Sequence, residues 1–192
     1  MPPNTRPHDW AVSLESARLL LRPFRHDDFE SLFAMHSRPE VARYLYWEPR
    51  SEDEVREALA RKIGRPRFEC DGDGLGFAVV LKSSSELIGD CSLFLASAEH
   101  RQGEIGFLFH PEHQGHGYAT EAARLLLRFA FEDVGLHRVI GRLEARNLRS
   151  ERVLERLGMR KEAHFVENEF VKGEWQSELV YAMVEGEWHG RV

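Results

Sequence analysis

Residues 104–122 read EIGFLFHPEHQGHGYATEA, and this stretch decides the fold class. It begins as a predominantly apolar strand, passes through a polar loop that holds Gly115 and Gly117, and continues into a helical pattern. The glycines remove side chains where the backbone turns and approaches a ligand, and the first turn of the helix presents unpaired N–H groups to the loop. This order of elements predicts an anion site, most naturally for a pyrophosphate.

The same loop has interpretations other than an anion site. The plain alternative is a glycine-rich turn that serves only to reverse the chain. A Walker A loop is excluded because no Gly-Lys-Ser/Thr triplet exists, and the dinucleotide fingerprint would need glycine at Thr120. His110, His113 and His116 are spaced by three with Glu112 among them, but zinc needs three or four converging ligands, for which a bound pyrophosphate leaves little room. We therefore predict no metal site.

The pattern on both sides of the loop predicts an α/β domain. Apolar residues from Ala119 to Val134 fall on one helical face and charged residues on the other. Ser51 with Glu54 three residues later forms a capping box at the start of another helix. Strands are expected over 14–24, 75–81, 87–95, 104–109, 139–145, 160–166 and 176–184, and helices after Asp28, after Pro39, and over 51–65, 119–134 and 148–157.

Length and composition fit one compact domain. The 192 residues are 42% hydrophobic and 30% charged, and we expect a single domain over 13–190 after a loose tail over 1–12. The net charge of −6 disfavours nucleic-acid binding. Cys70 and Cys91 form no disulfide pattern, no apolar signal opens the chain, and no run approaches the roughly 20 residues of a membrane span. A cytoplasmic location without a membrane partner is expected.

The loop also resembles a known family. Gln114, Gly115, Gly117 and Ala119 match the Q-x-x-G-x-G/A signature of the GCN5-related N-acetyltransferases. The wider context is similar to the branch of ribosomal-protein alanine and serine N-acetyltransferases, through LESARLLLRPFRHDD, PEVARYL and NLRSERVLERLGM in this order along the chain. The resemblance covers nearly the whole chain and is specific to fold and cofactor, but not to the acceptor.

The resemblance implies the fold and the place of the cofactor. The fold would be a mixed, mostly antiparallel sheet flanked by helices and splayed between its fourth and fifth strands, at 104–109 and 139–145. Acetyl-coenzyme A would lie in this gap as the co-substrate, with its pantetheine arm paired to backbone groups as an added strand is. The residues implied in binding it are Phe107, Leu108, Phe109, Gln114, Gly115, His116, Gly117, Tyr118, Ala119, Thr120, Asn147 and Ser150.

The resemblance also implies catalytic candidates, each with a plain alternative. Glu104 is a candidate general base beside the thioester, or else a solvated carboxylate at a strand end. Ser150 would protonate the departing thiolate, with Asn147 beside the pantetheine, whereas the plain interpretation is a helix cap by Asn147 and a small serine facing the core. Glu169 matches a glutamate proposed as base, although neighbouring glutamates make that alignment uncertain. Neither cysteine is placed as an acyl-carrying nucleophile.

Charge and aromatic residues fit two substrates of opposite charge. Residues 142–161 hold seven basic and three acidic side chains, whereas residues 162–178 hold five acidic and one basic. Adjacent patches of opposite sign suit an anionic coenzyme and a cationic amine, and ordinary solvated faces are the alternative. Five aromatic residues could form the wall of an acceptor cleft: Phe29, Phe33, Tyr44, Tyr46 and Trp47. Most of them are expected in the core, and Trp47 is the one whose role in the cleft should be tested first.

These observations predict direct acetyl transfer from acetyl-coenzyme A to a primary amine in a ternary complex. The branch resemblance implies a protein N-terminal α-amine as the acceptor. A small amine such as a polyamine or an aminoglycoside is the alternative, and a non-catalytic acyl-coenzyme A sensor is a third function from a different class. A homodimer follows from the resemblance alone.

Overall fold

The computed structural model of the protein describes residues 10–64 and 67–188, so residues 1–9 of the predicted tail lie outside the described part. Within these residues, eight strands form one sheet in the order β1-β2-β3-β4-β5-β6-β8-β7. The strands are β1 (Leu14–Glu15), β2 (Leu19–Arg22), β3 (Gly74–Leu81), β4 (Glu86–Ser97), β5 (Gln102–Phe109), β6 (Arg138–Glu144), β7 (Arg160–Val171) and β8 (Glu174–Val184). The helices are α1 (Phe29–His36), α2 (Pro39–Ala42), α3 (Glu52–Ile63), α4 (Tyr118–Arg128) and α5 (Leu148–Arg156).

The sheet opens between β5 and β6. Strands β2 to β5 pair antiparallel in chain order, which agrees with the predicted mostly antiparallel sheet. Strands β5 and β6 run parallel, and their pairing ends at Glu104 and Ile140. From Ile105 to Phe109, the edge of β5 that faces β6 is therefore unpaired within the described residues. The predicted mixed sheet with a gap between these two strands is confirmed.

The prediction of one strand over 14–24 is wrong. Leu14 pairs with Leu21 and Glu15 with Leu20, so the segment is a hairpin of β1 and β2. Ser16 fixes the turn, because its N–H donates to the Leu19 carbonyl at 3.0 Å and its hydroxyl accepts the Leu19 N–H at 3.0 Å. Such local side-chain bonds from serine compete with a continuous strand. The extra strand makes the splayed strands the fifth and sixth along the chain.

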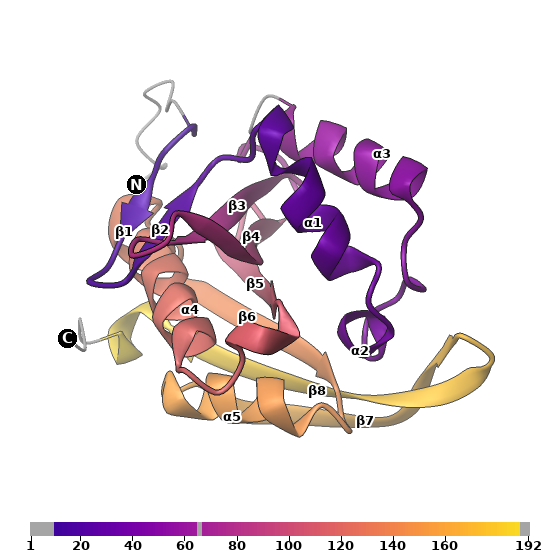
Figure 1. The fold of residues 1–192 in the computed structure, drawn as a ribbon. Helices are drawn as coiled ribbons and strands as arrows, with labels where there is room; N and C mark the ends of the chain where they lie inside the picture. The colour runs from indigo at the N-terminus through magenta and orange to yellow at the C-terminus, as the bar shows by residue number, and fades with distance from the viewer. Residues whose placement is uncertain (1–9, 65–66, 189–192) are drawn as a thin grey trace.

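Helices cover the two faces of the sheet separately (Figure 1). On one face, α1 and α3 pack Leu32, Val55 and Leu59 against Ala78 of β3. On the other face, α4 and α5 pack in the larger cluster that includes the next residue of the strand, Val79. Neighbouring strand residues point to opposite faces, so the sheet separates two apolar layers. The helix predicted over 119–134 is α4 followed by a π-turn over Phe129–Asp133.

A long hairpin formed by β7 and β8 extends past α2 (Figure 1). The sequence predicts strands over 160–166 and 176–184, whereas β7 runs on to Val171 and β8 begins at Glu174. Lys172 and Gly173 both have positive φ, 53° and 80°, as a tight hairpin turn requires. The hairpin carries large apolar side chains in solvent, with exposed fractions of 48% for Phe165, 71% for Val166, 63% for Phe170 and 60% for Trp175.

A buried polar cluster joins α1 and α3 to β4. Asp90 is 5% exposed, and its Oδ2 lies 2.8 Å from Lys62 Nζ and 3.3 Å from His36 Nε2. On its other side, His36 Nδ1 accepts a hydrogen bond from Arg50 Nη1 at 3.1 Å. Trp47 packs on the His36 ring at a centroid distance of 5.0 Å. The cluster therefore anchors the segment between α2 and α3 to the sheet.

The capping box of α3 provides the first testable prediction. The Ser51 hydroxyl accepts the Glu54 N–H at 3.4 Å, and the Glu54 carboxylate accepts the Ser51 N–H at 2.8 Å, as the sequence predicts. Ser51→Ala should lower the free energy of unfolding by about 1 kcal/mol, because the first turn loses its acceptor. Urea unfolding followed by circular dichroism measures this loss. Ser83→Ala, at an exposed turn position, is the control, and an equal effect of both changes would contradict the prediction.

Candidate functional site

A cavity of about 900 Å³ lies at the end of β5, beside the gap between β5 and β6. Its walls come from the end of β5, the loop and first turn of α4, the segment from Arg146 along α5 to Arg156, and the segment from α2 to Leu45. The predicted cofactor residues that line it are Phe107, Leu108, Phe109, Gln114, Gly115, Gly117, Tyr118, Ala119, Thr120, Asn147 and Ser150. The fold thus brings together residues from two segments about 30 positions apart.

The loop before α4 has the backbone geometry of an anion cradle. Gly115 and Gly117 have φ of 84° and 81°, a left-handed conformation that side chains other than glycine rarely adopt. A Cβ on Gly115 would meet nothing within 4 Å, so the requirement there is conformational rather than one of space. The first N–H groups of α4 have no partner within the helix and lie beside the cavity. This geometry fits a phosphate group.

Gln114 joins the loop to both walls of the gap. Its Nε2 donates to the Phe109 carbonyl at 3.2 Å, and its Oε1 accepts from Arg149 Nη1 at 2.5 Å. The end of β5 is therefore held against α5 across the mouth of the cavity. The Arg149 contact is a feature that sequence reasoning missed, although the excess of basic residues over 142–161 was the available signal.

Basic side chains surround the phosphate end of the cavity. Arg146, Arg149, Arg152 and Arg156 all line it, and the last three lie on α5 at helical spacing. A pyrophosphate carries negative charge, so these guanidinium groups complement it as the cradle does. The residues present thus fit the phosphate portion of a coenzyme.

Asn147 and Ser150 combine a structural contact with a position in the cavity wall. Asn147 Oδ1 accepts the Ser150 N–H at 3.2 Å and caps α5. The cap uses the serine backbone, and within the described residues the Ser150 hydroxyl makes no hydrogen bond to protein. The plain interpretation of Asn147 as a cap is therefore correct, and it leaves the hydroxyl available to a ligand.

His116 is the one predicted cofactor residue that does not line the cavity. Its ring stacks on Tyr118 at a centroid distance of 5.6 Å, and its carbonyl accepts a hydrogen bond from Arg18 Nη1 at 3.1 Å. Arg18 is held in turn by Glu121, an acid in the first turn of α4. His116 therefore shapes the loop from outside, and its predicted contact with a phosphate remains a prediction.

Glu104 lies at the apex of the gap, where the pairing of β5 with β6 ends. It does not line the cavity, and its Oε2 accepts hydrogen bonds from Nε and Nη2 of Arg142 at 3.0 and 2.9 Å. Register places both side chains on the sheet face opposite α4 and α5. Glu104 is therefore neither a solvated strand end nor a free carboxylate.

Glu169 reaches the same face from the β7–β8 hairpin. Its Oε2 accepts a hydrogen bond from the Tyr46 hydroxyl at 2.7 Å, although the residues are 123 positions apart. Nearby, Lys172 Nζ donates to the Ala42 carbonyl at 2.7 Å. These two contacts tie the hairpin to the segment that follows α2. Desolvation of its hydroxyl group and the hydrogen bond to Glu169 hold the pKa of Tyr46 well above its usual value, so its phenol stays protonated.

Glu178 of β8 is a third carboxylate at this place, and sequence reasoning did not single it out. It is 8% exposed, and its Oε2 lies 4.0 Å from Arg142 Nη1. Burial raises the pKa of Glu178 above its ordinary value of 4.5, against the opposing effect of Arg142. The negative charges of Glu169 and Glu104 contribute further to this higher pKa.

The aromatic residues expected around an acceptor cleft separate into two groups. Tyr44 lines the cavity and Tyr46 contacts Glu169. Phe29 stacks on Phe33 at 6.0 Å, and both pack against the apolar layer beneath α1 and α3. Trp47, the one singled out for a test, packs on His36 and beneath Arg50, so its contacts belong to the buried cluster.

The described residues contain neither a cluster of metal-ligating side chains nor a membrane-spanning helix. Over 10–64 and 67–188, no group of three or more His, Cys, Asp or Glu side chains is arranged to hold a metal ion. His110 and His113 contact each other at a ring distance of 5.9 Å, and His113 lies 3.2 Å from Glu86. Across the same residues, no helix combines the length and apolar character needed to span a bilayer.

This chain is similar to known proteins in sequence and in fold. The acetyltransferase (GNAT) domain family matches residues 18–160. The N-acetyltransferase YnaD of Bacillus subtilis is 31% identical over 178 residues, which cover 93% of this chain and all of YnaD. The spermidine N(1)-acetyltransferase of Vibrio cholerae is 27% identical over 165 residues, covering 84% of this chain and 90% of that protein.

A solved structure agrees with these sequence matches. The crystal structure of a GNAT-family acetyltransferase from Bacillus anthracis has a TM-score of 0.83 and 31% identity, and the match covers 92% of this chain and all of that one. The glycine loop, the splayed sheet and the sequence matches all indicate the same family. The chain therefore belongs to the GNAT acetyltransferase family, and it is an N-acetyltransferase with acetyl-coenzyme A as its co-substrate.

Proposed function

We propose that the domain over 13–190 transfers the acetyl group directly from acetyl-coenzyme A to the N-terminal α-amine of a protein, within a ternary complex. The observation that carries this proposal is the cavity beside the unpaired end of β5. Basic side chains line it, and Glu104, Glu169 and Glu178, which are not among its lining residues, lie on the opposite sheet face. An anionic coenzyme and a cationic amine would thus approach from opposite faces.

The roles of the binding residues follow from chemistry and position. Gln114 to Thr120 would hold the pyrophosphate by backbone N–H groups, with the α5 arginines opposite. The unpaired edge of β5 over Phe107–Phe109 would accept the pantetheine amides as an added strand. Asn147 would help to position this arm. Most of the rate can then arise from positioning the amine against the thioester.

The remaining steps are proton transfers. The acceptor must lose a proton from its ammonium, and the leaving thiolate must gain one. We assign the second step to Ser150, whose hydroxyl lines the cavity with its backbone N–H held by Asn147. The first step belongs to a carboxylate on the acceptor face, and Glu104 and Glu169 are the candidates from the sequence.

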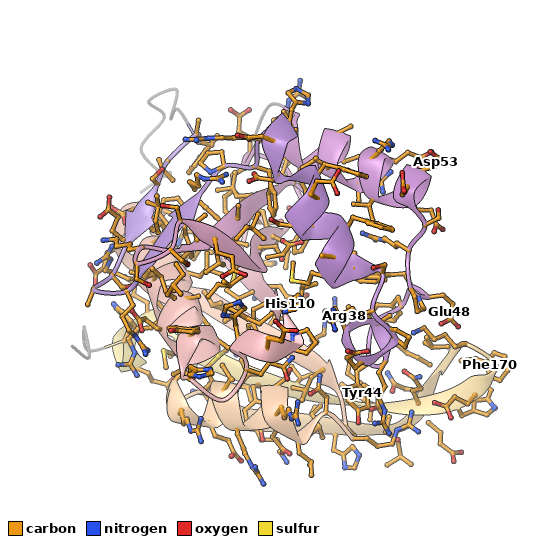
Figure 2. The ribbon with its side chains drawn as sticks, in the orientation of Figure 1. Arg38, Tyr44, Glu48, Asp53, His110 and Phe170 are labelled. Atoms are coloured by element: carbon orange, nitrogen blue, oxygen red, sulfur yellow. The ribbon has the colours of Figure 1, made fainter. Side chains whose placement is uncertain are left out.

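The hairpin surface supports a peptide as the acceptor. Phe170 and Trp175 lie in edge-to-face contact at 5.3 Å, next to Glu169 in sequence and register, and Tyr46 is 68% exposed. Figure 2 shows Phe170 near the end of the hairpin and Tyr44 between this region and the loop of α4. Phe170 and Trp175 form the pair next to Glu169 and Gln176, so their rings lie on the other face of the hairpin, whereas Tyr46 contacts Glu169. An extended peptide with its first residue at the carboxylates could pack its next side chain on the exposed Tyr46 ring.

A small polyamine is the second candidate. Arg142 contacts Glu104 and Glu178, whereas Glu169 accepts from the neutral Tyr46 hydroxyl, and this excess of negative charge suits an acceptor with more than one ammonium. The similarity to the Vibrio cholerae spermidine N(1)-acetyltransferase favours the same candidate.

The deciding experiment measures thiol release from acetyl-coenzyme A with peptides that begin in Ala or Ser, with spermidine and with an aminoglycoside, and identifies the products by mass spectrometry. Acetylated peptide N-termini support the main proposal. Turnover only with a small amine overturns the protein acceptor in favour of the second candidate. Tight coenzyme binding without turnover on any amine would instead indicate a non-catalytic sensor.

Ser150→Ala should lower kcat about 100-fold, because the thiolate loses its proton donor. The α5 cap uses only the backbone N–H of this residue, so the melting temperature should stay unchanged and the loss should appear in kcat far more than in the Kd for acetyl-coenzyme A. Steady-state kinetics with the acceptor found above, together with calorimetric titration of the coenzyme, measure these quantities. An unchanged kcat would remove Ser150 from the mechanism.

A further inference from the structure

Glu178 is a buried acid without a hydrogen-bonding partner. Two other acids of the described chain are buried as whole residues, Asp28 and Asp90, and the side chain of Glu144 is 6% exposed. Asp28 accepts from both Nη atoms of Arg22 at 2.8 and 2.7 Å, and Asp90 from Lys62 at 2.9 Å. The Glu178 carboxylate makes no hydrogen bond to the described residues, and its cation lies at 4.0 Å. Burial of a charge in this state is costly, so it indicates a group that awaits a ligand.

The charged neighbours of Glu178 are already engaged elsewhere. Arg142 gives two N–H groups to Glu104, at 3.0 and 2.9 Å. Glu144, directly opposite Glu178 on β6, is paired with Arg146 at 2.8 Å. On the other side, the Tyr46 hydroxyl donates to Glu169. Among the described residues, Glu104 and Glu169 add negative charge near Glu178, and its neighbouring cation, Arg142 at 4.0 Å, is already bonded to Glu104.

We propose that Glu178 binds the ammonium group of the acceptor amine and removes its proton. This inference rests on the proposed function and deepens it, because it names the base and the charge of the acceptor that the site takes. Glu104 is committed to Arg142 and Glu169 to Tyr46, so these two define the walls of the ammonium site. Glu178 of β8 lies between the strands that carry these two residues, since the sheet order is β5-β6-β8-β7, and the described residues donate no hydrogen bond to its carboxylate.

The proton balance of this step is simple. The acceptor R–NH₃⁺ gives one proton to the Glu178 carboxylate, which becomes a neutral acid. The freed nitrogen lone pair attacks the thioester carbonyl, the C–N bond forms, and the C–S bond breaks. The second proton lost by nitrogen reaches the thiolate by way of Ser150, and Glu178 returns its proton to solvent. A carboxyl group whose pKa is raised above its ordinary value is a stronger base than a solvated carboxylate, which suits a group that accepts a proton from an ammonium.

Glu178→Gln is the test, because it keeps the shape and removes the base. With the amine that the wild-type enzyme acetylates, a peptide beginning in Ala or spermidine, we expect kcat/KM to fall about 100-fold at pH 7. The KM for acetyl-coenzyme A should not change. The melting temperature should stay equal or rise, since an unpaired buried charge is removed. The matched control is Glu162→Gln. Glu162 lies at the start of β7 and pairs with Arg138 of β6, and this variant should keep full activity.

The pH profile separates the base from a purely structural residue. An α-amine has a pKa of about 8, so at pH 9 and above most of the peptide acceptor has already lost its proton. The fall in kcat/KM caused by Glu178→Gln should therefore become smaller as the pH rises. With spermidine as the acceptor, the same recovery should require a higher pH. A constant deficit at all pH values, or an unchanged kcat/KM at pH 7, overturns the assignment while transfer by the wild type stands. Absence of turnover by the wild type on both amines overturns the proposed function, and this inference with it.

Discussion

Gly117→Asp should raise the Kd for acetyl-coenzyme A about 1000-fold. The new carboxylate would lie at the N-terminus of α4, within the cradle proposed for the pyrophosphate. Two like charges about 4 Å apart repel by about 4 kcal/mol at the effective dielectric constant typical of a protein surface, and every 1.4 kcal/mol is a factor of ten. Calorimetric titration with coenzyme A measures the affinity.

Two controls isolate charge from backbone strain in this experiment. Gly117→Asn has nearly the same shape and tolerates the left-handed backbone equally well, but it adds no charge. Gly135→Asp adds the same charge at a positive φ of 77°, in the turn after α4 and outside the walls of the cavity. We expect both to bind coenzyme A far more tightly than Gly117→Asp. Equal losses in Gly117→Asp and Gly117→Asn would show that backbone strain, not repulsion of a phosphate, sets the affinity.

Asp90→Ala should lower the free energy of unfolding by about 3 to 5 kcal/mol, the effect expected when one partner of a buried ion pair is removed. Lys62 would keep its charge in a largely buried place, and His36 would lose the carboxylate 3.3 Å from its Nε2. Chemical denaturation at neutral pH measures the change. Glu15→Ala, which breaks the exposed pair with Lys82, is the matched control and should cost less than about 1 kcal/mol.

The same carboxylate gives the stability of the protein a pH dependence of known sign. Burial alone would raise the pKa of Asp90, but the neighbouring Lys62 and His36 outweigh it, so the pKa lies below its ordinary value of 3.8. The folded form then binds fewer protons than the unfolded form. This stabilisation is complete above about pH 4 and is lost as the pH falls through the native pKa, and Asp90→Ala should lack this dependence. A wild type and variant with parallel stability curves below pH 5 would contradict it.

The coenzyme half of the site could be predicted because its signals are local. A strand, two glycines and a helix follow one another within 104–122, and each element depends on the spacing and conformational freedom of its own residues. The same holds for the Ser51–Glu54 capping box and for Asn147 at the start of α5. The prediction of a single strand over 14–24 is wrong for a local reason as well, because the side chain of Ser16 stabilises a turn there.

The acceptor half could not be predicted from the sequence in this way. Tyr46 meets Glu169 across 123 positions, and Arg142 joins Glu104 to Glu178 between strands that are not consecutive in the sheet. Glu178 follows Ser177 in a strand of ordinary β pattern, and nothing in that pattern distinguishes it from the solvated glutamates of the hairpin. Its burial depends on which residues the pairing of β6, β7 and β8 places around it.

The sequence by itself determined the order of elements, the glycine loop and the family, because these depend on contacts between residues close together in the chain. Tertiary structure alone decided which glutamates are paired, which are solvated and which one is buried without a hydrogen bond. The physical reason is that the charge state and availability of a carboxylate depend on desolvation and on groups a few ångströms away, and the fold brings those groups from β5, β6, β7 and the segment after α2.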